Sequence, residues 1–195
     1  YQGLWAGGHV GKASTGARDD WYLAEGYTGW EGSLFDTYIL ISNDNPDPNP
    51  VTVTFFFPDG STRDFPFEAP PTGRLTVNAD ALLGEEQMIS TRVHAQAPVV
   101  VERAMYFDYR RELAGGHNAL GSASPSSSLY FAEGYTGNPA SRFETWLLIQ
   151  NTAAQPKTAL VDFILASGQT VQKEVPLPAS SRMILCFAPQ SMTTA

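Results

Sequence analysis

The side chains best suited to chemistry lie in a hexapeptide, AEGYTG, that occurs at residues 24–29 and again at residues 132–137. In both copies a glutamate is followed by a glycine and a tyrosine. A carboxylate next to an aromatic ring in a glycine-flanked loop is able to hold a sugar or a cation. A tryptophan follows the first copy and enlarges its aromatic surface. The binding candidates are Glu25, Tyr27, Trp30, Glu133 and Tyr135.

The same glutamates also have a structural interpretation. Glu25 would end a strand and pair with Arg103 or Arg74, which would fix how neighbouring hairpins meet. A half-buried pair of arginine and carboxylate fixes geometry more than it adds net stability. We favour this interpretation, in which the ion-pairing residues are Glu25, Arg74, Arg103, Glu133 and Arg182.

A second repeated motif, AGGH at residues 6–9 and 114–117, raises the question of a metal site. Zinc needs three or four ligands at defined spacing, and each copy supplies one histidine with no second His or Cys nearby. The motif instead predicts a Gly-Gly turn whose histidine bonds to the backbone. The sequence therefore predicts no metal site here.

The stretch SNDNPDPNP at residues 42–50 offers several oxygen ligands of the kind that calcium prefers. The aligned stretch of the second copy, QNTAAQPKT at residues 150–158, has no carboxylate, so we interpret both as polar hairpin connections. The sequence also contains no G-x-S-x-G, no H-E-x-x-H and no phosphate-binding loop before a helix. We therefore expect no catalysis and no cofactor.

These motifs belong to a larger internal repeat, because the chain aligns with itself without gaps at an offset of 108 residues. Identical pairs include Tyr22 and Tyr130, Asn43 and Asn151, Gly60 and Gly168, and Arg74 and Arg182. The phase of the repeat predicts three parts. Residues 1–18 match the end of a repeat or form an N-terminal arm, residues 19–126 form a complete repeat, and residues 127–195 form a second repeat that lacks its last two strands.

Apolar residues alternate with period two along most of the repeat, as they do in half-buried β-strands. The strand candidates are residues 34–43, 51–57, 61–68, 73–80, 88–95 and 98–107. Residues 79–87 hold one helical turn at most. This pattern predicts an all-β fold of tandem antiparallel β-sandwiches, Ig-like or jelly-roll-like.

The composition narrows the partners. The formal net charge is −8 with only three lysines, so we expect neither a nucleic-acid surface nor binding to anionic lipid. No apolar run approaches the roughly 18 residues that a membrane helix needs, which argues against membrane insertion. Cys186 is the single cysteine, so no intrachain disulfide is possible, and we expect it to be a small buried group in a strand.

The segments WYLAEGYTG, DTYILISN, VTVTFFFPDGSTR and APVVVERAMYF resemble a bacterial cell-surface repeat domain of uncharacterised function. That domain is found in tandem in large secreted proteins of actinobacteria and related lineages. The chain is also similar, more distantly, to the sensory rhodopsin transducer family, whose members are small oligomeric β-sandwiches. The resemblance implies an extracellular or cell-surface location and a sandwich fold, and it carries no catalytic motif.

A sandwich without its last two strands would expose an edge and an uncovered core. The second repeat would then be completed by further chain or by strands borrowed from a partner. We therefore expect a structural protein of an extracellular or cell-surface assembly, with copies of itself or neighbouring repeats as partners and strand exchange between subunits. The alternative is a carbohydrate-binding or adhesive module that recognises glycans, and an oligomeric signalling transducer is a third hypothesis.

Overall fold

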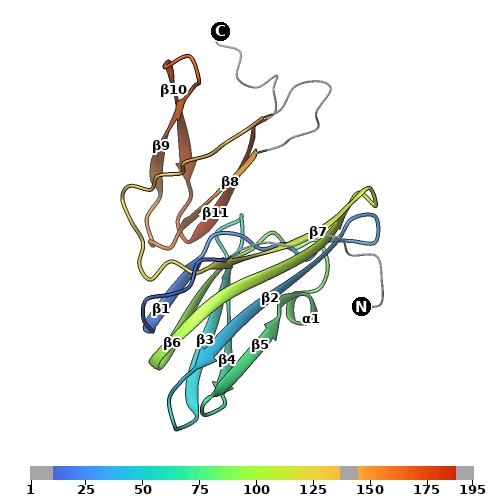
Figure 1. Cartoon of the computed structure of the whole chain (residues 1–195), viewed down its shortest axis with the longest axis vertical. Coiled ribbons are helices and arrows are strands. Elements are labelled where there is room, and N and C mark those ends of the chain that lie inside the picture. The colour runs from blue at the N-terminus through green and yellow to red at the C-terminus, as the bar shows by residue number, and fades with distance from the viewer. Residues whose placement is uncertain (1–10, 137–144, 188–195) are drawn as a thin grey trace.

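The computed structural model describes residues 11–136 and 145–187, which form antiparallel strands and one short helix (Figure 1). The predicted all-β, sandwich-like fold is confirmed. Two bodies of strands follow each other along the chain. The first unit comprises β1 to β7, and the second unit, orange to red in Figure 1, comprises β8 to β11.

The first unit contains seven strands and one helix. Its elements are β1 (Arg18–Leu23), β2 (Leu34–Asn43), β3 (Asn49–Phe56), β4 (Thr62–Ala69), β5 (Gly73–Asn78), α1 (Ala79–Leu83), β6 (Ser90–Tyr109) and β7 (Leu113–Leu120). The helix is the single turn that the sequence predicts, and the side chain of Asn78 caps it by accepting from the amide of Ala81.

Strand β6 holds the first unit together. Its first half, residues 90–95, lies between β3 and β1, and its second half, residues 100–109, lies between β2 and β7. Two layers therefore share one strand: β4-β3-β6-β1 and β5-β2-β6-β7. The inward-facing apolar residues of both layers form the core, which includes Trp21, Ile39, Ile41, Val53, Phe55, Val93, Val99 and Val101.

The sequence predicts two strands, at 88–95 and 98–107, where the structure has the single strand β6. The prediction was wrong because Pro98, which lacks an N–H, does not break the strand here. Asn49 donates to the Ala97 carbonyl at 2.8 Å and accepts from the Ala97 amide at 3.1 Å. Asn45 donates to the Pro98 carbonyl at 3.0 Å. These side chains satisfy the backbone where β6 changes from one pair of neighbours to the other.

The second unit repeats the outer strand pairs of the first, β2–β5 and β3–β4. Its strands are β8 (Thr145–Asn151), β9 (Lys157–Ile164), β10 (Thr170–Leu177) and β11 (Ser181–Phe187). At an offset of 108, β9 and β10 have the bounds of β3 and β4, and the β8–β11 pair has the register of β2–β5. Within the described residues no strand pairs with both β8 and β9, so the β9–β10 hairpin and the β8–β11 pair form two separate sheets.

Two smaller expectations need correction. Gly115 and Gly116 lie inside β7 and not in the predicted turn, and a side chain at either position would collide with the ring of Phe107 or Tyr106. The turn is made instead by Arg110 and Arg111, both at positive φ. Cys186 is in a strand, β11, as expected, but it is exposed and not buried.

Candidate functional site

Three of the charged side chains that the sequence singled out, Glu25, Arg103 and Arg182, meet at the junction between the two units. Arg103 lies on the core face of β6, two residues beyond Val101, and is only 2% exposed. Its Nη2 lies 2.9 Å from Oε2 of Glu25, which follows the end of β1. Burial lowers the pKa of the Arg103 guanidinium, and the charge of Glu25 acts in the opposite direction. The carboxylate therefore offsets a charge that would otherwise be buried alone.

His117 joins this ion pair from β7. Its Nδ1 lies 3.2 Å from Arg103 Nη2, and its Nε2 lies 3.9 Å from Glu25 Oε2. The sequence offered no sign of this contact, since it depends on the pairing of β7 with β6, which places His117 beside Met105. The histidine of the AGGH motif thus contacts the side chains of Arg103 and Glu25, and its predicted bond to the backbone stays a prediction.

Arg182 reaches the same place from the second unit. It lies on β11, is 4% exposed, and is close enough for Glu25 and Arg103 to act on its pKa. Burial lowers that pKa to about 10; Glu25 opposes this change and Arg103 adds to it. Arg182 therefore approaches the glutamate of the other unit, while its repeat equivalent, Arg74, is exposed on β5.

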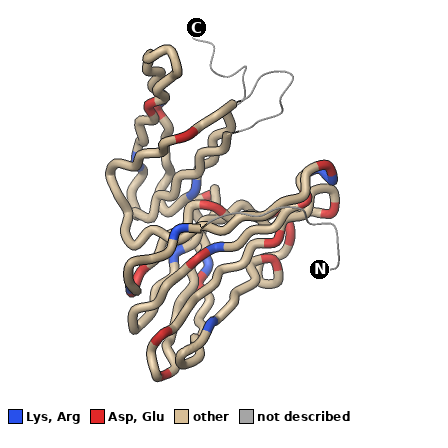
Figure 2. The backbone as a smooth tube through the Cα atoms, viewed as in Figure 1, with Lys and Arg blue, Asp and Glu red and all other residues tan. Residues whose placement is uncertain are grey.

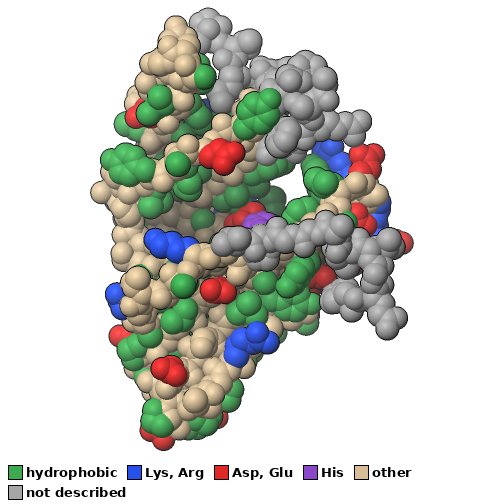
Figure 3. Space-filling view, viewed as in Figure 1, with side chains coloured by type: hydrophobic (Ala, Val, Ile, Leu, Met, Phe, Trp, Pro, Cys, Tyr) green, Lys and Arg blue, Asp and Glu red, His purple; other side chains and the backbone are tan. Residues whose placement is uncertain are grey.

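Two further contacts join the units at this junction. Gln150 of β8 donates to the carbonyl of Thr91 at 3.3 Å. The turn at Gly60 lies so close to the Ala179 carbonyl that an added Cβ would stand 3.2 Å from it. The space-filling view shows a hollow between the second unit and the β6–β7 turn, with a histidine and an acidic side chain beside it (Figure 3).

The other glutamate of the repeated hexapeptide has a different environment. Glu133 is exposed, and no ion pair of Glu133 occurs within the described ranges 11–136 and 145–187. Tyr135 is also exposed, yet its backbone is held as that of Tyr27 is. In each copy the threonine hydroxyl ten residues later accepts from the tyrosine amide and donates to its carbonyl, from Thr37 at 3.2 and 2.7 Å and from Thr145 at 3.1 and 2.6 Å.

The aromatic candidates of the first unit are arranged unequally. Tyr27 is half-buried and packs edge-to-face on Phe35, with ring centroids 5.0 Å apart, and burial raises the pKa of its hydroxyl. Trp30 is exposed on a tight turn closed by two hydrogen bonds with Ser33. Its ring covers Gly32, where any side chain would collide with it. Trp30 is thus the more accessible ring.

The polar stretch after β2 joins β2 to β3, and these strands pair with β6 and not with each other, so the prediction of a hairpin connection is wrong. Asn43 is buried and donates to the carbonyls of Asp47 and Pro70 at 3.1 and 2.9 Å. Across the residues that the structure describes, no group of three or more His, Cys, Asp or Glu is placed to hold a metal ion. No described helix is long and apolar enough to cross a membrane. Basic and acidic positions are interspersed along the described backbone (Figure 2).

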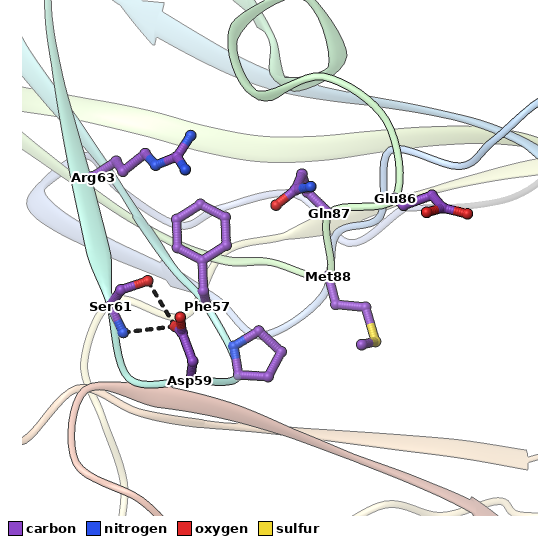
Figure 4. Close-up of a pocket in the computed structure, with 8 residues that line it drawn as sticks. Phe57, Asp59, Ser61, Arg63, Glu86, Gln87 and Met88 are labelled. Atoms are coloured by element: carbon purple, nitrogen blue, oxygen red, sulfur yellow. Dashed lines mark hydrogen bonds between the residues drawn. The ribbon is translucent and has the colours of Figure 1, made fainter.

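A shallow pocket of about 290 Å³ lies where the β3–β4 turn faces the segment after α1 (Figure 4). Phe57 carries the guanidinium of Arg63 over its ring at 5.1 Å. Asp59 accepts from the amide and hydroxyl of Ser61, and these bonds lower the pKa of the Asp59 carboxyl. The carboxylate is therefore engaged in its own turn.

The comparisons with known proteins concern the fold. No family model matches the chain, and no curated protein matches it. A crystal structure of Thermotoga maritima 1070 is similar over 57% of this chain and 97% of that chain, with a TM-score of 0.49 and 22% identity. The Anabaena sensory rhodopsin transducer is similar over 44% of this chain and 91% of its own, with a TM-score of 0.39 and 18% identity. At these values neither similarity carries an argument about function.

Proposed function

We propose that this chain is a non-catalytic structural part of an extracellular or cell-surface assembly, a stalk, coat layer or filament in which sandwich units follow one another head to tail. The contact between the two units carries this proposal. The second unit makes the contact through Gln150, Ala179 and Arg182. The equivalent residues of the first unit, Ser42, Pro71 and Arg74, are exposed.

The second unit also has part of the face that receives this contact. The first unit receives it through Glu25, Gly60 and Thr91. Two of these have exposed equivalents in the second unit, Glu133 and Gly168. A contact between two different faces of the same unit has no two-fold symmetry, so it can be repeated along a series. Copies of this chain or neighbouring repeats are the partners that such a contact fits.

Strand addition is the second part of the proposal. In the first unit, β1 pairs with β6, and its apolar side chains are covered. The equivalent residues before the second unit, Leu129, Tyr130 and Phe131, form no strand and are 67%, 93% and 72% exposed. A β6-like strand between β8 and β9 would pair with both of these strands, as β6 pairs with β2 and β3. The segment 126–131 would then have the partner that β1 has.

The first unit also indicates the sequence of such a strand. Val99, Val101 and Arg103 face the core side from alternate positions of β6. In the second unit the same register would place two valines over the half-buried inner face of β8 and an arginine beside Glu133. Glu133 would then have the partner that Glu25 has in Arg103.

A peptide with the sequence of residues 88–120, which carries β6 and β7, tests both parts of the proposal. We expect it to bind the full chain, and we expect the complex to associate further as concentration rises in sedimentation velocity. Arg74→Glu reverses the charge at the free face, so it should stop the further association and leave peptide binding unchanged. Lys12→Glu, an equal charge change at another exposed residue, is the matched control.

The outcomes separate the two parts. Peptide binding without further association would contradict the head-to-tail contact and support strand addition alone. Absence of binding, together with a monomeric chain whose second unit is as protected from hydrogen exchange as its first, would contradict strand addition. A peptide with Val99→Asp and Val101→Asp should not bind, because it would place two charges against the apolar face.

The exposed ring of Trp30 supports the alternative, a carbohydrate-binding or adhesive module. A tryptophan held on a rigid turn offers the flat apolar surface on which sugar rings stack. Binding to a glycan panel that disappears in Trp30→Ala and Tyr27→Ala would favour this function. Binding that survives both substitutions, or no binding across a broad panel, would remove it.

A further inference from the structure

Arg182 is a buried cation whose hydrogen-bonding groups are not all used. The residue is 4% exposed, and its Nε and Nη1 atoms are buried without a hydrogen-bond partner. An unsatisfied buried donor is costly, and the cost is greater for a charged group. Within the described residues, the guanidinium of Arg103 has partners in Glu25 and His117, so Arg182 differs from it in this respect.

The charges at the junction do not balance. Two buried guanidinium groups, Arg103 and Arg182, face one carboxylate, that of Glu25. The ion-pair distance of 2.9 Å assigns this carboxylate to Arg103. Arg182 is near enough to both to respond to their charges, but it makes no ion pair within 4.0 Å of Glu25. Among the residues that the structure describes, one positive charge of the cluster therefore has no counter-charge in contact.

The cluster is open to solvent on one side. The side chains of His117 and Glu25 remain 37% and 30% exposed, whereas Arg103 is 2% exposed. In the space-filling view the hollow beside the second unit leads to a histidine and an acidic side chain (Figure 3). The imidazole of His117 and the carboxylate of Glu25 therefore form the solvent-facing side of the cluster.

We propose that the junction between the two units is a binding site for a small oxyanion, a carboxylate or phosphate group that accepts hydrogen bonds from Arg182. The N–H groups at Nε and Nη1 of Arg182 are the donors, and Arg103 adds positive charge behind them. Charge-assisted bonds of this kind are stronger than neutral ones, and a buried site strengthens them further. Such a ligand would join the units, since Arg182 and Arg103 belong to different ones.

This oxyanion has two possible sources that share the same chemistry: a free anion from solution, or a carboxylate side chain of a second copy of the chain. The test uses the full chain in a buffer without oxyanions. Thermal unfolding is followed while inorganic phosphate is added, against sodium chloride at matched ionic strength. We expect the unfolding midpoint to rise with phosphate, by about 5 °C at a concentration about 100-fold above Kd.

Two substitutions at equivalent positions provide the control. Arg182→Met replaces the buried cation by an apolar chain of similar length, so it should abolish the phosphate response and raise the midpoint in phosphate-free buffer. Arg74→Met, at the exposed equivalent on β5, should keep the response of the native chain. Arg182→Gln serves as a second variant if Arg182→Met does not give a native circular dichroism spectrum.

Three results are distinguishable. A phosphate response that Arg182→Met abolishes supports the proposal with a free anion. In the second result, the unfolding midpoint does not change with phosphate but rises with protein concentration, and only when Arg182 is present. This result supports the proposal with a carboxylate of a second copy as the oxyanion. No response of either kind, or an equal phosphate response in Arg182→Met, overturns the proposal. None of these results depends on strand addition, so the assembly proposal is judged separately.

Discussion

The two units of this chain have the same local hydrogen bonds and different cores. In both, an asparagine at the end of a strand donates to three backbone carbonyls at equivalent positions: Asn43 to Asp47, Ala69 and Pro70, and Asn151 to Gln155, Leu177 and Pro178. The same turns have positive φ, 84° at Gly60 and 82° at Gly168, and 45° at Thr72 and 48° at Ser180. Equivalent strand pairs of the two units are thus held by the same side-chain hydrogen bonds and the same turns.

The cores differ because β2 and β3 both pair with β6, whereas no strand among the described residues pairs with both β8 and β9. Ile41 and Val53 are fully buried, and their equivalents Ile149 and Val161 are half-buried. Phe56 is 6% exposed, while its equivalent, Ile164, is 81% exposed. The comparison teaches that the β9–β10 hairpin and the β8–β11 pair form without a strand between them, whereas the sandwich of the first unit depends on one long strand that pairs with both β2 and β3.

The largest expected difference between the units concerns Phe56 and Ile164. Phe56→Ala should lower the free energy of unfolding of the first unit by about 4 kcal/mol, because it removes a buried ring. Ile164→Ala should change the stability of the second unit by less than about 0.5 kcal/mol, because that side chain already contacts water. Native-state hydrogen exchange measures each unit separately. Equal losses would contradict the difference in burial.

The next largest difference concerns the repeated glutamates. Glu25→Gln keeps the shape of the side chain but leaves the buried charge of Arg103 without its counter-charge, so the first unit should lose about 3 kcal/mol. Glu133→Gln should change stability by less than about 0.5 kcal/mol, since Glu133 is exposed. Urea denaturation of the two variants checks this. A loss from Glu133→Gln as large as that from Glu25→Gln would show that the glutamates are equivalent after all.

The asparagines should behave alike where the glutamates do not. Asn43→Ala and Asn151→Ala each leave backbone carbonyls without donors, so each should destabilise its own unit by about 2 kcal/mol. Hydrogen exchange in β2 and β8 provides the readout. A loss confined to Asn43→Ala would mean that Asn151 does not hold the segment after β8 as Asn43 holds the segment after β2.

The smallest expected effect is a pH response confined to the first unit. Asp80 accepts from the Thr37 amide, and burial raises the pKa of its carboxyl from 3.8 to about 6. The folded state therefore favours the protonated form, and this stability is present below pH 3.8 and lost as pH rises through 6. Because the carboxyl is partly exposed, we expect Asp80→Asn to be more stable than the native chain by only about 1 kcal/mol at pH 7.

That difference should become small near pH 3.5, where the carboxyl is largely protonated in both states. Denaturation of Asp80→Asn and the native chain at the two pH values is the measurement. The second unit has Ala188 at the equivalent position of the sequence, so its stability should not follow this titration. A constant difference between the variants at both pH values would assign the effect to packing.

Local patterns were enough to predict much of this molecule. Period-two alternation located β2 to β5, and the offset of 108 anticipated the strand bounds of the second unit. The continuity of β6 was missed because it depends on Asn45 and Asn49, which are far from Pro98 in sequence. Sequence alone gave no reason to place Arg182 beside Glu25 of the other unit, since that approach depends on how the units pack. The contact of His117 was missed because it depends on the pairing of β7 with β6.

The central claim is that pairing with β6 makes the difference in burial between β2 and β3 and their equivalents β8 and β9. Hydrogen exchange of the amides in β2 and β3, compared with those in β8 and β9 of the same full-length chain, tests it most directly. We expect exchange in β8 and β9 to be at least about 100-fold faster, and to slow when the peptide of residues 88–120 is added. Equal protection of the two sets in a monomeric chain without peptide would contradict the account.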